Sequence, residues 1–319
     1  MHERTFAAEV AENVKNEVGK VIVGMEEAIE SLLIALFTGG HIIMEGVPGL
    51  AKTLLAKSFA LSLGLNFKRI QFTVDILPSD IIGGLVFNRK SGELEFRPGP
   101  IFANVVLIDE INRAPPRSQS ALLEAMQERQ VTVEGVSYRL PEPFLVIATQ
   151  NPIELEGTFP LPEAEVDRFM MRVIVSYPTP EEERQILAMK NVLGDDIPIN
   201  PVVDKQSINR AVEEVRNVTV APDVIKYIVD ISSVSRGDSR LTIGASPRAE
   251  IALLYASKAL AAINGRRYVI PDDVKKVFFR VVNHRLQPKP EYSSLSRTPD
   301  YAFVTSLVKE YLNSVEVPV

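Results

Sequence analysis

The chain has 319 residues, of which 46% are hydrophobic, so it can bury a sizeable core and is long enough for two domains. It contains no cysteine, which excludes disulfide scaffolds, cysteine nucleophiles and thiolate metal sites. Its 35 Lys and Arg against 41 Asp and Glu give a net charge of −6, so a dedicated nucleic-acid binder is not expected. No apolar run reaches the roughly 20 residues of a membrane span, and the N-terminus lacks the apolar segment of a signal peptide. We therefore expect a cytoplasmic protein.

Short apolar runs alternate with helical patterns in the first half of the chain. The clearest run is Val105-Val-Leu-Ile-Asp109, which is continuous, aliphatic and ends on an acid. Strands that alternate with helices indicate a parallel sheet covered by helices on both faces. We therefore expect an α/β fold with a five-stranded parallel sheet. The predicted strands cover residues 41–45, 67–72, 105–109, 144–148 and 172–175, and the helices between them include 52–63 and 118–130.

Two segments interrupt this alternation. Residues 77–102 contain Gly83-Gly84 and Arg97-Pro-Gly-Pro100, which predict turns around short elements. Residues 131–138 alternate about a Glu-Gly pair and predict a small hairpin. We expect both segments to be exposed insertions.

After Tyr177 the periodicity becomes helical, and we place a domain boundary near Pro178. Several of the expected helices open with Ser, Asp or Pro, which are typical of helix starts. In this prediction residues 1–177 form the α/β domain, and residues 178–319 form an all-helical domain with a C-terminal helix. The expected helices cover residues 181–191, 206–215, 222–235, 247–263, 271–285 and 299–312.

A glycine-containing loop lies between the first predicted strand and the helix that starts at Lys52. Its glycines allow backbone N–H groups to turn towards phosphate oxygens, and the helix N-terminus adds a positive dipole. Lys52 supplies a charge to the β- and γ-phosphates of ATP, and Thr53 offers its hydroxyl to Mg²⁺. The sequence therefore predicts a phosphate-binding loop that consists of Gly46, Val47, Pro48, Gly49, Leu50, Ala51, Lys52, Thr53 and Leu54.

Ala51 departs from the phosphate-loop pattern G-x-x-x-x-G-K-S/T, which has glycine at this position. Alanine carries a Cβ, so the loop requires a backbone conformation at this position that alanine tolerates. The alternative reading is an ordinary glycine turn before a helix that happens to contain Lys-Thr.

The strand that ends at Asp109 delivers a second carboxylate, Glu110, at the same edge of the predicted sheet. Asp109 is placed to hold Mg²⁺, directly or through water, and Glu110 to act as the general base that activates water for attack on the γ-phosphate. A solvated Asp-Glu pair after a buried strand is the alternative. Downstream of a phosphate loop, the catalytic reading is favoured.

These residues resemble those of the AAA+ ATPases and, within them, of the MoxR family. The resemblance covers nearly the whole chain. The loop Gly-Val-Pro-Gly-Leu-Ala-Lys-Thr looks like the MoxR version, in which Ala commonly replaces the expected glycine, so Ala51 supports the family. Val23-Gly24 resembles the segment that packs on adenine in AAA+ proteins. The insertions at 77–102 and 131–144 resemble the helix-2 insertion and the pre-sensor-1 hairpin, which tend to face the pore or a partner.

The resemblance also implies roles for polar residues further along the chain. Asn151 looks like sensor 1, which positions the attacking water, although an Asn before a proline is also ordinary turn chemistry. Arg168 lies in a stretch that resembles the one carrying the arginine finger, which acts on the neighbouring subunit's γ-phosphate; Arg172 and Arg113 are competitors for that role. Arg248 resembles sensor 2 and would reach the phosphates across the domain cleft.

The resemblance implies a ring, a hexamer, in which Mg²⁺-dependent ATP hydrolysis drives the remodelling or maturation of a client protein or the insertion of metal into it. A partner with a von Willebrand factor A domain is often involved in such systems. Two alternatives stay open: the ATPase subunit of a metal chelatase, and a nucleotide-gated regulatory or assembly module. The family implies ATP and Mg²⁺ as cofactors in each case.

Overall fold

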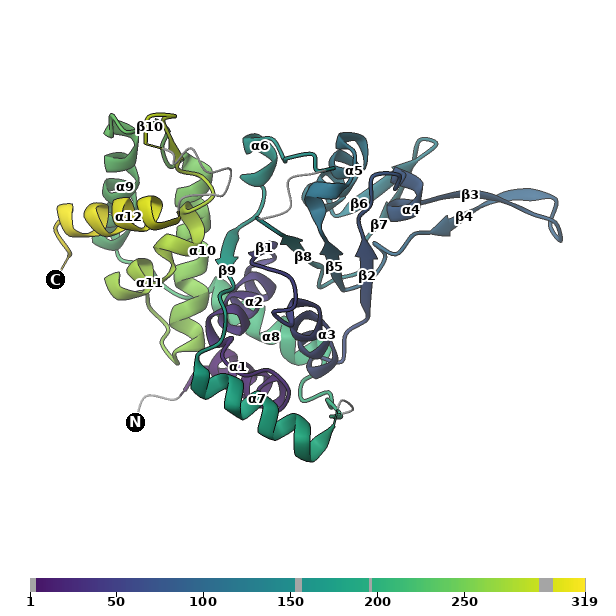
Figure 1. Cartoon of the computed structure of the whole chain (residues 1–319), viewed down its shortest axis with the longest axis horizontal. Helices are drawn as coiled ribbons and strands as arrows, with labels where there is room; N and C mark the ends of the chain where they lie inside the picture. Colours follow the sequence, from purple (N-terminus) through teal and green to yellow (C-terminus); the bar gives the residue numbers. More distant parts are fainter. Residues whose placement is uncertain (1–3, 153–156, 195–196, 293–300, 319) are drawn as a thin grey trace.

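A computed structural model describes residues 4–152, 157–194, 197–292 and 301–318. Its central sheet has five parallel strands in the order β2-β5-β8-β1-β9, which confirms the expected α/β fold (Figure 1). Each strand matches a predicted one to within about two residues, the usual uncertainty of element ends. The strands are β1 (Ile42–Glu45), β2 (Phe67–Gln71), β5 (Val105–Asp109), β8 (Leu145–Gln150) and β9 (Met171–Ile174).

The register of the sheet brings the carboxyl ends of its strands to one edge. Glu45 of β1 pairs with Gln150 of β8, and Gln71 of β2 pairs with Asp109 of β5. Ligands of open parallel sheets bind outside this edge, because the loops that leave the strands there meet around a crevice. The phosphate loop and the acidic pair therefore come together.

Helices cover both faces of the sheet, because alternate strand residues point to opposite sides. Leu107 and Ile147 belong to the core beneath α1, α2 and α3, whereas Val106 and Ile108 belong to the core beneath α5. Our sequence analysis predicted α3 and α5 but no helices at α1 and α2. The bounds are α1 (Phe6–Val18), α2 (Glu26–Thr38), α3 (Lys52–Ser62) and α5 (Pro116–Glu128).

The first insertion has the expected short elements, and the second has the expected hairpin. The first forms a two-stranded hairpin that projects from the body of the molecule (Figure 1). Phe96 of this hairpin stacks on Tyr138 of the second insertion, with ring centroids 3.9 Å apart, so the two insertions pack against each other. Their elements are α4 (Pro78–Ile82), β3 (Gly83–Asn88), β4 (Glu93–Pro98), β6 (Gln130–Val133) and β7 (Val136–Arg139).

The second half of the chain is mainly helical, with one short antiparallel strand pair in addition. The predicted start of the last helix at Pro299 lies outside the described residues. Among the described residues, the model has no helix that is both long and apolar enough to span a bilayer. The elements are η1 (Ile111–Arg113) and α6 (Glu163–Val166) before the boundary, then α7 (Pro180–Leu193), α8 (Lys205–Arg216), α9 (Pro222–Gly237), β10 (Leu241–Ile243), α10 (Pro247–Ile263), α11 (Pro271–Val282), β11 (Gln287–Pro288) and α12 (Tyr301–Ser314).

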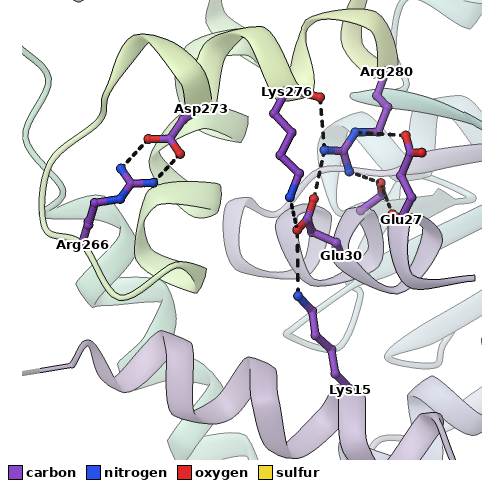
Figure 2. Close-up of polar contacts among 8 residues, drawn as sticks. Lys15, Glu27, Glu30, Arg266, Asp273, Lys276 and Arg280 are labelled. Carbon is purple, nitrogen blue, oxygen red and sulfur yellow. Dashed lines mark hydrogen bonds and ion pairs between the residues drawn. The ribbon is translucent and has the colours of Figure 1, made fainter.

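A buried charge network joins the two halves (Figure 2). Arg280 of α11 donates to the Glu30 carboxylate at 3.0 Å and to the Ser31 hydroxyl at 2.8 Å, both on α2. Lys276 binds the other carboxylate oxygen of Glu30 at 2.8 Å. Ile208 of α8 also belongs to the core that α1 and α2 share. The boundary at Pro178 stays a prediction, and helices beyond it pack closely on the α/β domain.

Candidate active site

The phosphate loop leaves β1 at Gly46 and enters α3 at Lys52. A Cβ on Gly46 would overlap the carbonyl oxygen of Val175, so only glycine fits between β1 and the segment that follows β9. Gly49 has a φ of +85° and open space around it, which suits a position whose N–H faces a ligand. The local fold is thus the strand–loop–helix that the motif requires.

Ala51 adopts a left-handed conformation, with φ 54° and ψ 19°. This region costs a residue with a Cβ about 1–2 kcal/mol, which explains why the general motif has glycine here. Alanine therefore occupies a strained position at the start of α3, and such strain persists where the surrounding structure holds it in place.

Lys52 and Thr53 point from the first turn of α3 into the crevice. The Lys52 ammonium donates to the carbonyl oxygens of Gly46 and, at 3.3 Å, of Val47, so it lies across the loop. Burial lowers the pKa of Lys52, although the charges of Asp109, Glu45 and Glu110 act in the opposite direction. The Thr53 hydroxyl lies 3.4 Å from Oδ2 of Asp109, which brings together the two residues predicted to hold Mg²⁺.

Glu110 follows Asp109 with a left-handed backbone, φ 58° and ψ 55°, which turns its side chain away from the strand. Its N–H donates to the Thr149 hydroxyl at 3.0 Å, and that hydroxyl donates to Asp109 Oδ1 at 3.2 Å. Both acidic residues are therefore tied to the end of β8, next to the predicted sensor residue Asn151. Asn151 is itself buried at the strand end.

Two residues of β2 contact the acidic pair, and sequence reasoning missed both. Arg69 Nε lies 2.5 Å from Asp109 Oδ2, and Gln71 Nε2 donates to Glu110 Oε2 at 2.8 Å. Arg113 Nε also lies 3.0 Å from Glu110 Oε2. The sequence did contain a signal for these two residues. Arg69 and Gln71 are two positions apart in a predicted strand, so their side chains lie on the same face of that strand.

These groups line a cavity of about 470 Å³ at the carboxyl edge of the sheet. Among the described residues that line the cavity, neither Val23 nor Gly24 appears. Gly24 lies against Glu182 in the first turn of α7, because a Cβ added to Gly24 would be 2.7 Å from the carboxyl carbon of Glu182. The cavity is lined by Pro48, Gly49, Leu50, Ala51, Lys52, Thr53, Leu54, Arg69, Gln71, Asp109, Glu110, Thr149, Gln150 and Asn151.

The three arginines considered for the finger differ in their surroundings. Arg172 is largely enclosed, with Nη1 3.3 Å from Glu45 and Nε donating to Asn283 Oδ1 at 2.7 Å. Arg113 pairs with Glu110 of its own subunit. Arg168 lies on an exposed stretch after α6 and does not line the cavity of its own chain. Arg168 is thus exposed and Arg172 is enclosed, and the assignment of the finger stays a prediction.

Arg248 lies beside Arg168 in the structure. Its Nη1 is 3.0 Å from Oδ2 of Asp167, the residue before Arg168, and it does not line the described cavity. The other Asp167 oxygen accepts from the buried Arg285 at 2.6 Å. The predicted sensor 2 and finger residues are thus brought together on one face, and contact of Arg248 with its own phosphates stays a prediction.

Known proteins are similar to this chain in both sequence and fold. Residues 41–171 match the ATPase family associated with various cellular activities (AAA), and residues 234–301 match the AAA lid domain. Chaperone MoxR1 of Mycobacterium tuberculosis is 43% identical over 292 residues, covering 88% of this chain and 77% of the relative. Protein MoxR of Methylorubrum extorquens is 30% identical over 308 residues, covering 89% of each. The chain belongs to the MoxR family of AAA+ ATPases.

A solved structure of a candidate ATPase from Cytophaga hutchinsonii has the same fold, with a TM-score of 0.89 and 40% identity over 98% of this chain and 96% of that one. Like other members of the MoxR family, this chain is an ATP-hydrolysing enzyme with a chaperone-like role. Its site fits a nucleotide: the partly buried Lys52 ammonium lies across the loop, Gly49 borders the cavity with open space around it, and the Asp109 carboxylate lies 3.4 Å from the Thr53 hydroxyl. That donor set also fits the oxygen ligands Mg²⁺ prefers.

Proposed function

We propose that this MoxR-family enzyme couples Mg²⁺-dependent ATP hydrolysis to the remodelling, maturation or metal loading of a client protein. The observation that carries the hydrolytic part is the shared cavity, which Lys52 and Thr53 of the phosphate loop line together with Asp109 and Glu110 at the end of β5. Helix α3 supplies the positive charge for the phosphates, and the end of β5 supplies the carboxylate that activates water. Phosphoryl transfer requires such groups to be held in fixed positions.

Each residue has a defined role in this proposal. Lys52 binds the β- and γ-phosphates through its ammonium, and Thr53 with Asp109 holds Mg²⁺, which neutralises phosphate charge when bound. Glu110 accepts a proton from the attacking water, and Asn151 orients that water from the end of β8. Val23 and Gly24 contact the adenine, and the remaining loop residues contribute backbone N–H groups to the phosphates.

Two variants test the hydrolytic assignment. Glu110→Gln keeps the shape of the side chain and removes the base, so ATP binding should persist while turnover falls at least about 100-fold. Lys52→Ala should weaken ATP binding about 10- to 100-fold, the effect of losing one charge-assisted hydrogen bond. ATP affinity is measured by titration calorimetry and turnover by phosphate release. Unchanged turnover in both variants would remove the basis of the proposal.

We also propose a homo-oligomeric ring, a hexamer, in which Arg168 acts on the nucleotide of a neighbouring copy. Because Arg248 does not line the cavity of its own chain, we propose that it acts on the neighbour's nucleotide as well, in place of the predicted contact with its own phosphates. Its support is that both arginines lie outside their own cavity and on the same face. Arg168→Ala should lower turnover by about 10³-fold or more. Mixing Arg168→Ala copies with Lys52→Ala copies should restore part of the activity, because the defects lie in complementary halves of a shared site.

The client, a von Willebrand factor A domain partner and a cytoplasmic location stay predictions from the sequence. The metal-chelatase alternative predicts stimulation of ATPase by a porphyrin-binding partner. The regulatory-module alternative predicts slow turnover that a client does not accelerate. Affinity capture with Glu110→Gln and ATP, followed by mass spectrometry, tests for a client that stays bound when hydrolysis is blocked.

A further inference from the structure

Helix α7 is only half-buried on its inner face, where Ile186 and Met189 lie. Among its 14 residues, all within the described part of the chain, none is buried, and Leu187 and Val192 are 69% and 76% exposed. An isolated helix of this length is marginal in water, because helices in proteins gain most of their stability by packing an apolar face. We infer that a surface outside this subunit covers the outer face of α7.

A second exposed stripe runs along α10. Arg248, Ile251 and Tyr255 repeat at intervals of three and four residues, so they lie on one face of the helix. Arg248 has a side chain 54% exposed, and Ile251 and Tyr255 are 53% and 49% exposed. We call these three residues the α10 stripe.

The α10 stripe leads into a cavity at the far end of the helix. This cavity of about 700 Å³ includes Tyr255 and Lys258 among its lining residues. The buried rings of Phe37 and Phe144 also line it. It is separate from the nucleotide cavity and shares no lining residue with it. Tyr255 belongs to both the stripe and the cavity, so the two adjoin along α10.

The two surfaces belong to different sides of the shared site. The segment that leads into α7 flanks the phosphate loop, because the Val175 carbonyl lies against Gly46 and Glu182 lies against Gly24. The α10 stripe starts at Arg248, which is paired with Asp167 next to Arg168. If Arg168 of one copy reaches the nucleotide of another, we expect the face with the α10 stripe to meet the face with α7.

We propose that the α10 stripe and its cavity receive helix α7 of a second copy of this chain. The proposal rests on the proposed ring and specifies its interface. The two surfaces differ, so the contact is head-to-tail, the type of contact that closes into a ring. Each copy would thereby cover the exposed side of its neighbour's α7 while it delivers Arg168 and Arg248.

Charge and length agree with this pairing. The first turn of α7 carries Glu181 and Glu183, both exposed, and it would face Arg248 and Arg168. The rise from Arg248 to Tyr255 is about 10 Å, and the rise from Pro180 to Leu187 is the same, since each spans seven residues of α-helix. If Arg248 of one copy lies opposite Pro180 of the other and the two helices run parallel, Tyr255 lies opposite Leu187, and the end of α7 near Val192 lies at the cavity.

Site-directed cross-linking tests this register, because the chain has no cysteine of its own. The full-length double variant Leu187→Cys/Tyr255→Cys is treated with a short bismaleimide in the presence of Mg²⁺ and ATP and separated on a denaturing gel. Both positions are exposed, so folding should be retained. We expect a ladder of covalent multimers, since every copy carries one reactive group on each of its two faces.

Two controls fix the direction of the contact. Equal mixing of Leu187→Cys copies with Tyr255→Cys copies should give covalent dimers only, because each copy then has one reactive face. The matched variant Leu187→Cys/Ile225→Cys places its second cysteine at an exposed position on α9, away from the stripe, and should give no ladder.

The possible failures are distinguishable. Assembly by native mass spectrometry without cross-linking between positions 187 and 255 would overturn the α7–α10 interface and leave the ring intact. Absence of assembly, together with no rescue when Arg168→Ala and Lys52→Ala copies are mixed, would overturn both the interface and the ring on which it rests.

Discussion

The Nη1 atom of Arg248 lies 3.0 Å from Oδ2 of Asp167, and the second carboxylate oxygen of Asp167 accepts a hydrogen bond from Arg285 at 2.6 Å. One carboxylate therefore joins an exposed arginine of α10 to a buried arginine after α11. Arg285 also donates to the backbone carbonyls of Phe169 and Met170, so it holds the stretch that carries Arg168. This relationship links the position of the proposed finger to the lid.

Replacement of Asp167 by Asn should destabilise the protein by about 2–3 kcal/mol, because Arg285 would keep its buried charge and lose its counter-ion. Arg248→Ala, which removes the exposed partner, should cost less than about 1 kcal/mol. Urea unfolding followed by circular dichroism measures both. Equal costs for the two variants would show that the buried arm of the network is not the stabilising one.

Arg172→Ala should not behave like a finger variant. Arg172 binds Glu45 at the start of the phosphate loop and Asn283 on the lid side, so its loss damages the site of its own subunit. Turnover of mixtures of Arg172→Ala and Lys52→Ala copies should therefore show no rescue. Mixtures of Arg168→Ala and Lys52→Ala copies serve as the positive control. Rescue with Arg172→Ala would mean that this arginine acts on a neighbour.

Arg69→Gln should lower the Mg²⁺ concentration needed for half-maximal ATPase activity. The Arg69 guanidinium pairs with the Asp109 oxygen nearest Thr53, so it competes with the metal for that carboxylate. A half-exposed pair is worth up to about 1 kcal/mol, which corresponds to a change of up to about fivefold. Lys68→Gln makes the same charge change at the preceding exposed position and should leave the Mg²⁺ dependence unaltered. A higher Mg²⁺ requirement in Arg69→Gln would contradict the competition.

Ala51→Gly should stabilise the nucleotide-free protein by up to about 1 kcal/mol, because relief of the left-handed strain exceeds the added entropy of the unfolded chain. ATPase activity should be retained, since glycine is the usual residue of the motif. Ala56→Gly, inside α3, is the matched control and should destabilise by about 1 kcal/mol or more. Thermal and urea unfolding measure the free energy of unfolding of both variants and of the parent protein. If Ala51→Gly were less stable than the parent protein, residue 51 would not have the strained positive φ.

Stability should fall as the pH drops below about 6.5, because two histidines are buried in the neutral form. Burial lowers the pKa of His41 to about 4 and that of His284 well below its ordinary value. The unfolded chain takes up protons in this range while the folded chain does not, so the stability is complete above pH 6.5 and decreases on acidification. Each histidine contributes a slope of roughly 1.4 kcal/mol per pH unit.

The slope is measured by urea unfolding between pH 5 and 6.5. His41→Gln should remove about half of it, since one of the two buried groups is lost. The carboxyl groups with lowered pKa, such as Glu30 and Asp238, lose their stabilising contribution only at lower pH. A stability that does not depend on pH in this window would show that both rings are protonated in the folded protein.

The sequence by itself determined the local elements of the site. The aliphatic run before Asp109, the glycine loop before Lys52 and the helix starts at Pro247 and Pro271 are local signals, because strand and helix periodicity and turn chemistry depend on neighbours in the chain. The family resemblance extended this reading to Asn151. Helix α2 was missed because its mostly apolar run lacks a clear polar face, and helix α1 was missed although its apolar residues recur at helical spacing.

Only the tertiary structure decided which polar groups meet. Arg69 and Gln71 contact Asp109 and Glu110 because β2 is hydrogen-bonded to β5, a pairing of segments about 40 residues apart that no local pattern encodes. The same holds for the arginines: Arg168 and Arg172 are four residues apart in one stretch, yet one is exposed and the other is enclosed by β1 and the lid. Long-range packing selects between chemically identical side chains, since their surroundings come from distant parts of the chain.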